Sequence, residues 1–308
     1  MDRREFLERV AAWSTGVCLV SPVFKVRDIV AAELKSRKPS VLTVARGKDC
    51  AALVDRTLKP LGGIEAFVQK GMRVVVKPNI GWDRPPEQAA NTNAAVVKAI
   101  VQRCLGAGAK RVMVFDRPCN DPRRSYARSG IPAAVASIGD PRAQCVQLNP
   151  KRCVPVQIDG GKSIRQFEFY RDALETDCDC YINVPVAKHH ALARLTLGLK
   201  NIMGVLGGNR GELHKDIGQR LADLNLVVRP KLTIIDATRI LLRNGPGGRN
   251  LDDVKALDTL VASADPVAVD AYATTLFDLK PDEISSTVAA FKLGLGEMDL
   301  TKVKIVEA

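Results

Sequence analysis

Short runs of β-branched residues alternate with stretches of helical periodicity from about Ser40 onward, and this alternation constrains the fold more than any other feature. The expected strands lie at 41–45, 73–77, 111–115, 181–184 and 232–236. The expected helices lie at 93–105, 211–228 and 266–277, and Thr92 or Asn93 is suited to cap the first. Strands that alternate with helices predict βα units. We therefore expect an α/β fold with an open, mostly parallel sheet flanked by helices.

Residues 140–170 break this regularity and predict a small irregular or antiparallel insertion. A chain of 308 residues is long enough to bury a large core, and it contains no internal repeat or low-complexity linker. We interpret residues 1–38 as a targeting segment with its linker and residues 39–308 as an α/β domain, built as one unit or two lobes.

The amino terminus carries an export pattern. Arg3 and Arg4 are followed by Phe6-Leu7 and then by an uncharged, moderately apolar stretch at 10–24. This order resembles a twin-arginine signal. The resemblance implies the twin-arginine translocase as a partner, a periplasmic location, export in the folded state and a membrane anchor if the signal is not removed. The alternative is an amphipathic cytosolic helix.

Charge limits the classes of partner. The chain has 46 Lys and Arg against 34 Asp and Glu, a net charge of +12, which suits an anionic substrate, a nucleic acid or an acidic membrane surface. Aromatic residues make up only 5%, and no zinc-finger or RNP-like motif is present, so nucleic-acid binding is disfavoured. No uncharged apolar run approaches the roughly 20 residues of a spanning helix.

Eight cysteines contain no C-x-x-C pair, so the sequence has no intrinsic ferredoxin-type iron–sulfur motif and no common zinc spacing. Cys145 and Cys153 are close enough in sequence for a disulfide to be conceivable in an oxidising compartment. For Cys178 and Cys180 a structural role is the favoured interpretation.

Polar side chains follow several expected strands. Lys77-Pro78-Asn79 ends one strand, Asp116 the next and Asp236 a third. Ligands collect at strand ends in open α/β sheets, because loops and helix amino termini converge there. Each of these residues also suits a turn or a cap.

All three histidines fall within 26 residues, interleaved with cationic side chains. The segment contains Lys188, His189, His190, Lys200, Asn201, Arg210 and His214. Imidazole binds metals or moves protons at neutral pH, and lysine holds anions or forms an imine or amide. We expect His190, Lys200 and His214 to be catalytic, with Lys77, Asn79, Lys188, Asn201 and Arg210 binding a cofactor. The alternative is that the histidines are unrelated loop and surface residues.

In order along residues 40–295, these motifs resemble the DUF362 family, a family of unknown function. The matching motifs are Lys77-Pro78-Asn79, Asn91-Thr92-Asn93, Gly106-Ala107-Gly108-Ala109, Asp116, Pro185-x-x-Lys188-x-His190, Leu197-Gly198-Leu199-Lys200-Asn201-x-x-Gly204, His214, Asp236, Asn244-Gly245-Pro246 and Asp265-Pro266-Val267-Ala268-Val269-Asp270. Some members carry a ferredoxin-type cysteine cluster that this chain lacks, which puts electron transfer in doubt.

A second similarity is to nickel-dependent lactate racemases, in which a Pro-His segment, a lysine that carries a cofactor and a further histidine follow in the order of His190, Lys200 and His214. It implies that Lys200 contacts or carries an organic cofactor and that the histidines act as bases or metal ligands. The amino-terminal histidine pair of the racemases has no counterpart here. This argues against racemisation, which needs two poised bases.

The sequence therefore predicts a periplasmic, cofactor- or metal-dependent enzyme that acts on an anionic small molecule at the strand ends. A metal ion or a metal-bound organic cofactor would use His190, His214, Asp116 and Asp236 as ligands. The alternative is a carrier or maturation protein that holds a metal or an anion without turnover.

Overall fold

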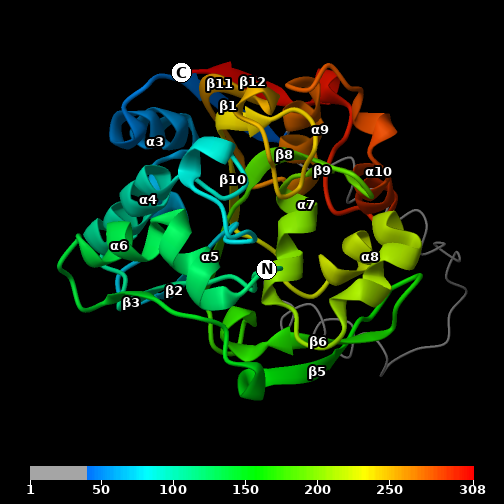
Figure 1. The fold of residues 1–308 in the computed structure, drawn as a ribbon, viewed down its shortest axis with the longest axis horizontal. Helices are drawn as coiled ribbons and strands as arrows, with labels where there is room; N and C mark the ends of the chain where they lie inside the picture. Colours follow the sequence, from blue (N-terminus) through cyan, green and yellow to red (C-terminus); the bar gives the residue numbers. More distant parts are fainter. Residues whose placement is uncertain (1–39) are drawn as a thin grey trace, which may run out of the picture. The chain divides into compact units, whose positions relative to one another are not determined.

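A ten-stranded sheet forms the centre of the part of the chain that the computed structural model describes, residues 40–308 (Figure 1). Along its main path the order is β12 (Lys304–Glu307), β1 (Val41–Arg46), β11 (Val254–Ser263), β10 (Leu232–Leu241), β7 (Cys180–Val184), β2 (Arg73–Pro78), β3 (Arg111–Val114) and β4 (Ala143–Cys145). Beside β10 lies β8 (Val186–His190), which pairs in turn with β9 (Arg194–Thr196). The twin-arginine segment lies outside the described residues.

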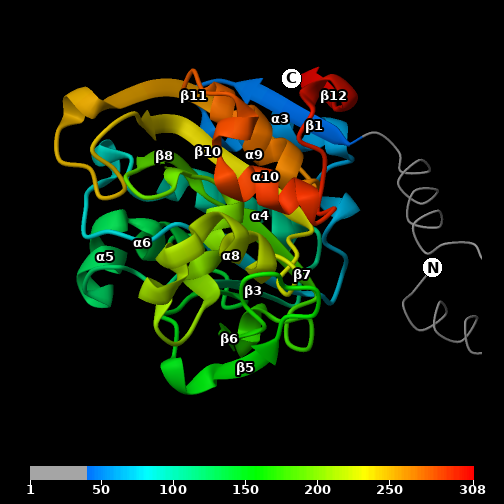
Figure 2. The ribbon, with the colours of Figure 1, turned by 90° about the vertical axis from the view of Figure 1, so that its right-hand side faces the viewer.

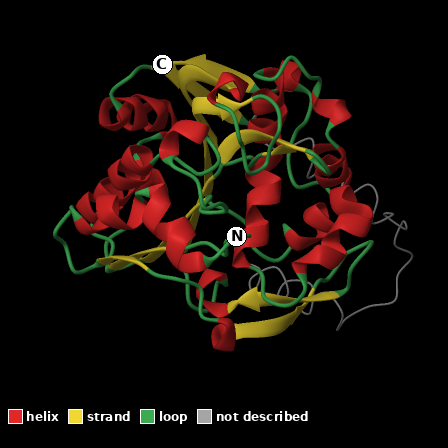
Figure 3. Ribbon diagram, viewed as in Figure 1, coloured by secondary structure: helices red, strands yellow, loops and turns green. Residues whose placement is uncertain are grey.

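Most neighbouring strands of this sheet are parallel. Only β11 and β9 run against their partners. Helices cover both faces, as Figure 3 shows by the red helices on either side of the yellow strands. The predicted α/β fold with a mostly parallel sheet is therefore confirmed.

Alternation along the strands sends side chains to two cores. Val74 and Val76 of β2 pack in the cluster that contains α3 (Cys50–Leu58) and α4 (Ala94–Gly106). Val75, between them, joins a cluster with α8 (Ile217–Leu224) and β6 (Gln166–Tyr170). Near the other edge, β1 and β11 pack against α9 (Pro266–Thr275), while α10 (Ser285–Lys292) packs against α8 and α9 (Figure 2). Two short helices, α5 (Pro122–Ser129) and α6 (Ile131–Ala136), lead from β3 into β4.

The irregular segment at 140–170 divides between two sheets. Its first part supplies β4 at the edge of the main sheet. Its second part contains β5 (Cys153–Gln157), which pairs with β6 to form a separate two-stranded antiparallel sheet, as the sequence predicts. Cys145 and Cys153 are both free thiols, as are the other five cysteines of residues 40–308.

The predicted helix at 211–228 is wrong in part. Residues Arg210–Asp216 form a 3-10 helix, and the α-helix α8 begins only at Ile217. Asp216 has φ −148° and ψ 59°, which lies outside the helical region and separates the two segments. His214 therefore lies on the 3-10 helix.

Candidate functional site

A cavity of about 370 Å³ opens where β2, β3 and β8 end. It is lined by Lys77, Asn79, Gly81, Trp82, Asp116, Arg117, Cys119, Lys188, His190, Thr196, Lys200, Asn201, Met203, Gly204, Gly208, Asn209, Arg210, Gly211, His214 and Pro246. After β2 the chain passes through α4 to β3 on one side, whereas β7 leads through α7 (Gly198–Asn201) and α8 to β10 on the other. Because the connections diverge at β2 and β7, loops leave a crevice there.

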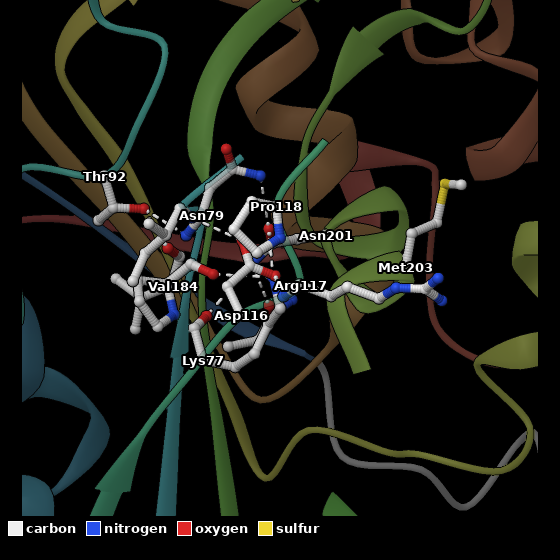
Figure 4. Close-up of polar contacts among 12 residues, drawn as sticks. Lys77, Asn79, Thr92, Asp116, Arg117, Pro118, Val184, Asn201 and Met203 are labelled. Atoms are coloured by element: carbon white, nitrogen blue, oxygen red, sulfur yellow. Dashed lines mark hydrogen bonds and ion pairs between the residues drawn. The ribbon is translucent and has the colours of Figure 1, made fainter. Parts of the chain in front are cut away.

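Lys77 and Asp116, which both line the cavity, form a buried ion pair (Figure 4). The Lys77 Nζ lies 2.8 Å from Asp116 Oδ1 and also donates to Pro78 O and Asn201 Oδ1, so all three ammonium hydrogens have acceptors. Both side chains are at least 97% buried. Burial lowers the pKa of Lys77, and the Asp116 carboxylate opposes that shift.

Three amides join this pair to the neighbouring elements. Asn201 of α7 accepts from Lys77 and from Asn79 Nδ2, and it donates to Asn183 Oδ1 on β7.

Asp270 of α9 fixes the start of α7, since its carboxylate accepts from the backbone N–H groups of Gly198 and Leu199. Burial raises the pKa of Asp270 to about 7.

Lys188 and Lys200 are less fully bonded than Lys77. Lys188 Nζ donates to Asn79 Oδ1 at 2.9 Å and to Ala90 O at 2.5 Å, which leaves one hydrogen for a ligand. Among residues 40–308, the hydrogen-bonding contact of Lys200 Nζ is with the Met203 thioether, at 3.5 Å. Burial lowers the pKa of Lys188 to about 7 and that of Lys200 to about 8, and repulsion from neighbouring cations adds to both shifts.

The rings of His190 and His214 are stacked with centroids 6.4 Å apart, but they offer the cavity different atoms. His190 Nδ1 accepts from Leu192 N and Ala193 N, so its Nε2 carries the proton. His214 Nδ1 lies 3.1 Å from Gly211 O, which can only accept, so the neutral ring has its lone pair on Nε2. Burial lowers the pKa of His190 to about 3, with the charges of Lys200 and Lys188 adding to the shift. His190 is therefore a neutral hydrogen-bond donor at pH 7, whereas the neutral form of His214 has its acceptor on Nε2.

Two arginines brace the wall of the cavity. The Arg210 guanidinium donates to the carbonyls of Arg117, Pro118 and Met203, and that of Arg117 donates to the carbonyls of Leu206, Gly207 and Gly208. Each side chain thus holds the loop that carries the other. The two guanidinium groups thus donate mainly to backbone carbonyls. Both side chains also line the cavity, so they add positive charge to it.

The structure brings together nine of the ten predicted site residues. Lys77, Asn79, Asp116, Lys188, His190, Lys200, Asn201, Arg210 and His214 all line the cavity. Asp236 does not, because β10 continues past it to Leu241 and its carboxylate accepts from Asn93 N, Thr238 N and Thr238 Oγ1. The prediction that Asp236 lies in the same cleft is corrected: this carboxylate joins β10 to the start of α4.

Of the four predicted metal ligands, Asp116, His190 and His214 line the cavity and Asp236 does not. Within residues 40–308, no group of three or more His, Cys, Asp or Glu side chains is arranged to hold a metal ion. The hydrogen bonds of His190 also oppose metal ligation, since Nε2 could bind a metal only if its proton moved to Nδ1, which already faces two N–H donors.

Several lining residues were not predicted. Arg117 and Cys119 lie on the loop that follows β3, and Trp82 lies on the loop that follows β2. The strand-end rule that selected Asp116 and Asn79 could have found these residues had it been extended by three positions. Met203 carries no comparable signal in the sequence.

Comparison with known proteins gives one family and few relatives. The family described as a domain of unknown function, DUF362, matches residues 74–275. A thylakoid-associated protein of Synechocystis sp. is 30% identical over 253 residues, which make up 77% of this chain and 73% of that protein. A solved structure from Thermotoga maritima matches with a TM-score of 0.47 and 12% identity; it covers 76% of this chain, which spans only 60% of that one.

Proposed function

The chain belongs to the DUF362 family, and from this premise we propose that the cavity binds a small organic anion, as the substrate of an enzyme. One observation carries the proposal: among the described residues, five cationic side chains line the cavity against one carboxylate, that of Asp116. The ordinary pairing of charges in a protein interior is missing here. A bound anion would supply it.

The donors that remain free indicate how the anion would be held. Among the described residues, Lys77 is saturated, whereas Lys188 keeps one hydrogen and Lys200 has no oxygen acceptor. His190, which lines the cavity, carries its N–H on Nε2. Three donors around one hollow match the several lone pairs of a carboxylate or phosphate group. His214, with its free Nε2, can accept a proton from the same ligand.

An enzyme is favoured over a carrier because the neutral rings of His190 and His214 are different tautomers: His190 has its proton on Nε2, and His214 has its lone pair there. A neutral N–H donor stabilises a developing oxyanion, and a nearby lone pair removes a proton. A carrier would need only the cations. The alternative, a non-catalytic anion carrier, predicts that the bound anion is recovered unchanged and that His214→Gln alters only affinity and stability.

The proposal is tested by calorimetric titration with oxalate and with inorganic phosphate. Lys200→Met should weaken binding about 10- to 100-fold, because a hydrogen bond to a charged group contributes about 1.5–3 kcal/mol. Lys162→Met is the matched control, since Lys162 is exposed and does not line the cavity. It removes the same charge and should leave the affinity within about twofold.

Affinity should also fall as pH rises through 7 to 8, because the pKa values of Lys188 and Lys200 are about 7 and about 8 and only the ammonium forms attract an anion. Failure of both probes to bind, or equal effects of Lys200→Met and Lys162→Met, would refute the proposal.

We also propose export through the twin-arginine route and the binding of a metal or metal-bound cofactor. Export by the twin-arginine translocase to the periplasm predicts that replacing Arg3 and Arg4 by lysine blocks export of the chain. A metal or a metal-bound cofactor, including one of the kind that the similarity to lactate racemases implies, is tested by elemental analysis and intact mass of natively exported protein. Neither proposal is needed for the anion site.

A further inference from the structure

Three lysines share the cavity, and their hydrogen bonding separates them. Lys77 is saturated by a carboxylate, a carbonyl and an amide oxygen. Lys188 is held by an amide oxygen and a carbonyl. Within the described part of the chain Lys200 has neither, and its one polar contact there is a thioether sulfur, a weak acceptor. Lys200 is also the one of the three that is only partly buried, so its nitrogen is both the least engaged and the most accessible from the cavity.

The sparse hydrogen bonding of Lys200 suits a neutral amine better than an ammonium group. As an ammonium, Lys200 would depend on water or a ligand in the cavity for acceptors, whereas an amine has two hydrogens and a lone pair that can act as a nucleophile toward the ligand. The neighbouring cations Lys77, Lys188, Arg117 and Arg210 disfavour a further positive charge. Because the pKa of Lys200 is lowered to about 8, part of the Lys200 side chains are unprotonated at pH 7 and can react. An amine of this kind is a nucleophile.

We propose that Lys200 forms an imine with the carbonyl carbon of a small 2-oxo acid, an aldehyde or ketone that also carries a carboxylate. The inference rests on the proposed anion site: the remaining hydrogen of Lys188 and the cavity charge hold the carboxylate, and the amine of Lys200 attacks the adjacent carbonyl carbon. Lys200 is favoured over Lys77 and Lys188 because oxygen acceptors fix the nitrogens of those two, three acceptors at Lys77 and two at Lys188, within fully buried side chains.

The step is balanced without an oxidant or reductant. The amine nitrogen forms a bond to the carbonyl carbon, and one of its protons moves to the oxygen to give a carbinolamine. The hydroxyl then leaves as water with the second amine proton, and a carbon–nitrogen double bond remains. His190, a neutral N–H donor, stabilises the oxygen as charge develops on it, and the His214 lone pair relays a proton.

The experiment uses the full chain with pyruvate and with glyoxylate, in the presence of cyanoborohydride to reduce an imine to a stable secondary amine. Intact mass should show one adduct per chain, and peptide mapping should place it on Lys200. The exposed Lys162 of the same molecules is the internal control and should stay unmodified. Lys200→Arg, which keeps the charge but not the nucleophile, should lose the adduct.

Oxalate supplies a second measurement on the wild-type chain, which does not depend on any variant folding. It carries carboxylates but cannot form the imine, so it should slow labelling by competing for the cavity. At saturating pyruvate, where the weaker affinity at high pH does not limit labelling, imine formation should become faster as pH rises toward 8, as the amine fraction of Lys200 does.

Adduct spread over surface lysines, or persisting in Lys200→Arg, would overturn the inference. Oxalate binding with no adduct on Lys200 would also overturn it, yet would leave the anion site standing. An absence of both oxalate binding and adduct would remove the proposed function as well.

Discussion

Replacing Asp116 by Asn removes the counter-ion of a fully buried ammonium and keeps the shape of the side chain. At 2.8 Å and an effective dielectric constant near 20, the attraction between Lys77 and Asp116 is about 6 kcal/mol. Lys77 limits the loss by releasing its proton, which costs about 5 kcal/mol at pH 7 for an amine whose unfolded pKa is near 10.4. We therefore expect Asp116→Asn to lower the free energy of unfolding by about 3–5 kcal/mol.

Urea denaturation at pH 7 measures this loss, and the exposed pair Arg46 and Glu307 provides the matched control. Their atoms approach to 2.6 Å, closer than those of the buried pair, but both side chains are more than half exposed. Glu307→Gln should therefore cost no more than about 1 kcal/mol. Equal losses for the two variants, or an Asp116→Asn loss below about 1 kcal/mol, would refute the view that burial makes this pair important.

Two other substitutions test the site by stability. His190 has a pKa of about 3 in the folded chain against an ordinary value of 6.5, so the unfolded chain binds more protons between these values and stability is lost as pH falls through that window. In His190→Gln the free energy of unfolding should fall less steeply, by up to about 1.4 kcal/mol per pH unit, in denaturation series from pH 6.5 to 4; parallel curves for the two proteins would contradict the buried neutral imidazole. A Cβ at Gly204 would overlap Asp116 Oδ1 and the Lys77 side chain, so Gly204→Ala should lower the thermal midpoint strongly, whereas Gly106→Ala, which meets open space at the end of α4, should not. Similar midpoints for the two alanine variants would show that the ion pair tolerates displacement.

The sheet could be predicted from the sequence because its strands are short, apolar and bounded by polar residues. β2 was predicted at 73–77 and found as Arg73–Pro78, and Asn93 caps α4 through a hydrogen bond from Ala95 N. β11 was missed: its first half, with Lys255 and Asp258, is only partly buried and lacks the apolar run that marked the other strands. It lies between β10, the preceding strand, and β1, which is distant in sequence, and local pattern does not reveal such a distant partner.

The sequence predicted most of the residues that line the cavity, but it did not predict the hydrogen bonds that they make. The strand-end rule selected Lys77, Asn79 and Asp116 correctly, because β2 and β3 do end there. The same rule failed at Asp236, because pairing with β11 carries β10 on for five more residues. Where a strand ends depends on the length of its neighbour, which the strand's own residues do not encode.

The two histidines show what the backbone adds to residue type. His190 is followed by a turn whose N–H groups at 192 and 193 point at Nδ1, and His214 lies three residues after a carbonyl, that of Gly211. Identical side chains thus become a donor and an acceptor in one cavity. A ligand that satisfies both must bring an acceptor to His190 and a donor to His214, in addition to a negative charge for the lysines. The carbonyl oxygen of a 2-oxo acid can accept a hydrogen bond from His190. The carbinolamine hydroxyl formed from that oxygen can then donate a hydrogen bond to His214 Nε2.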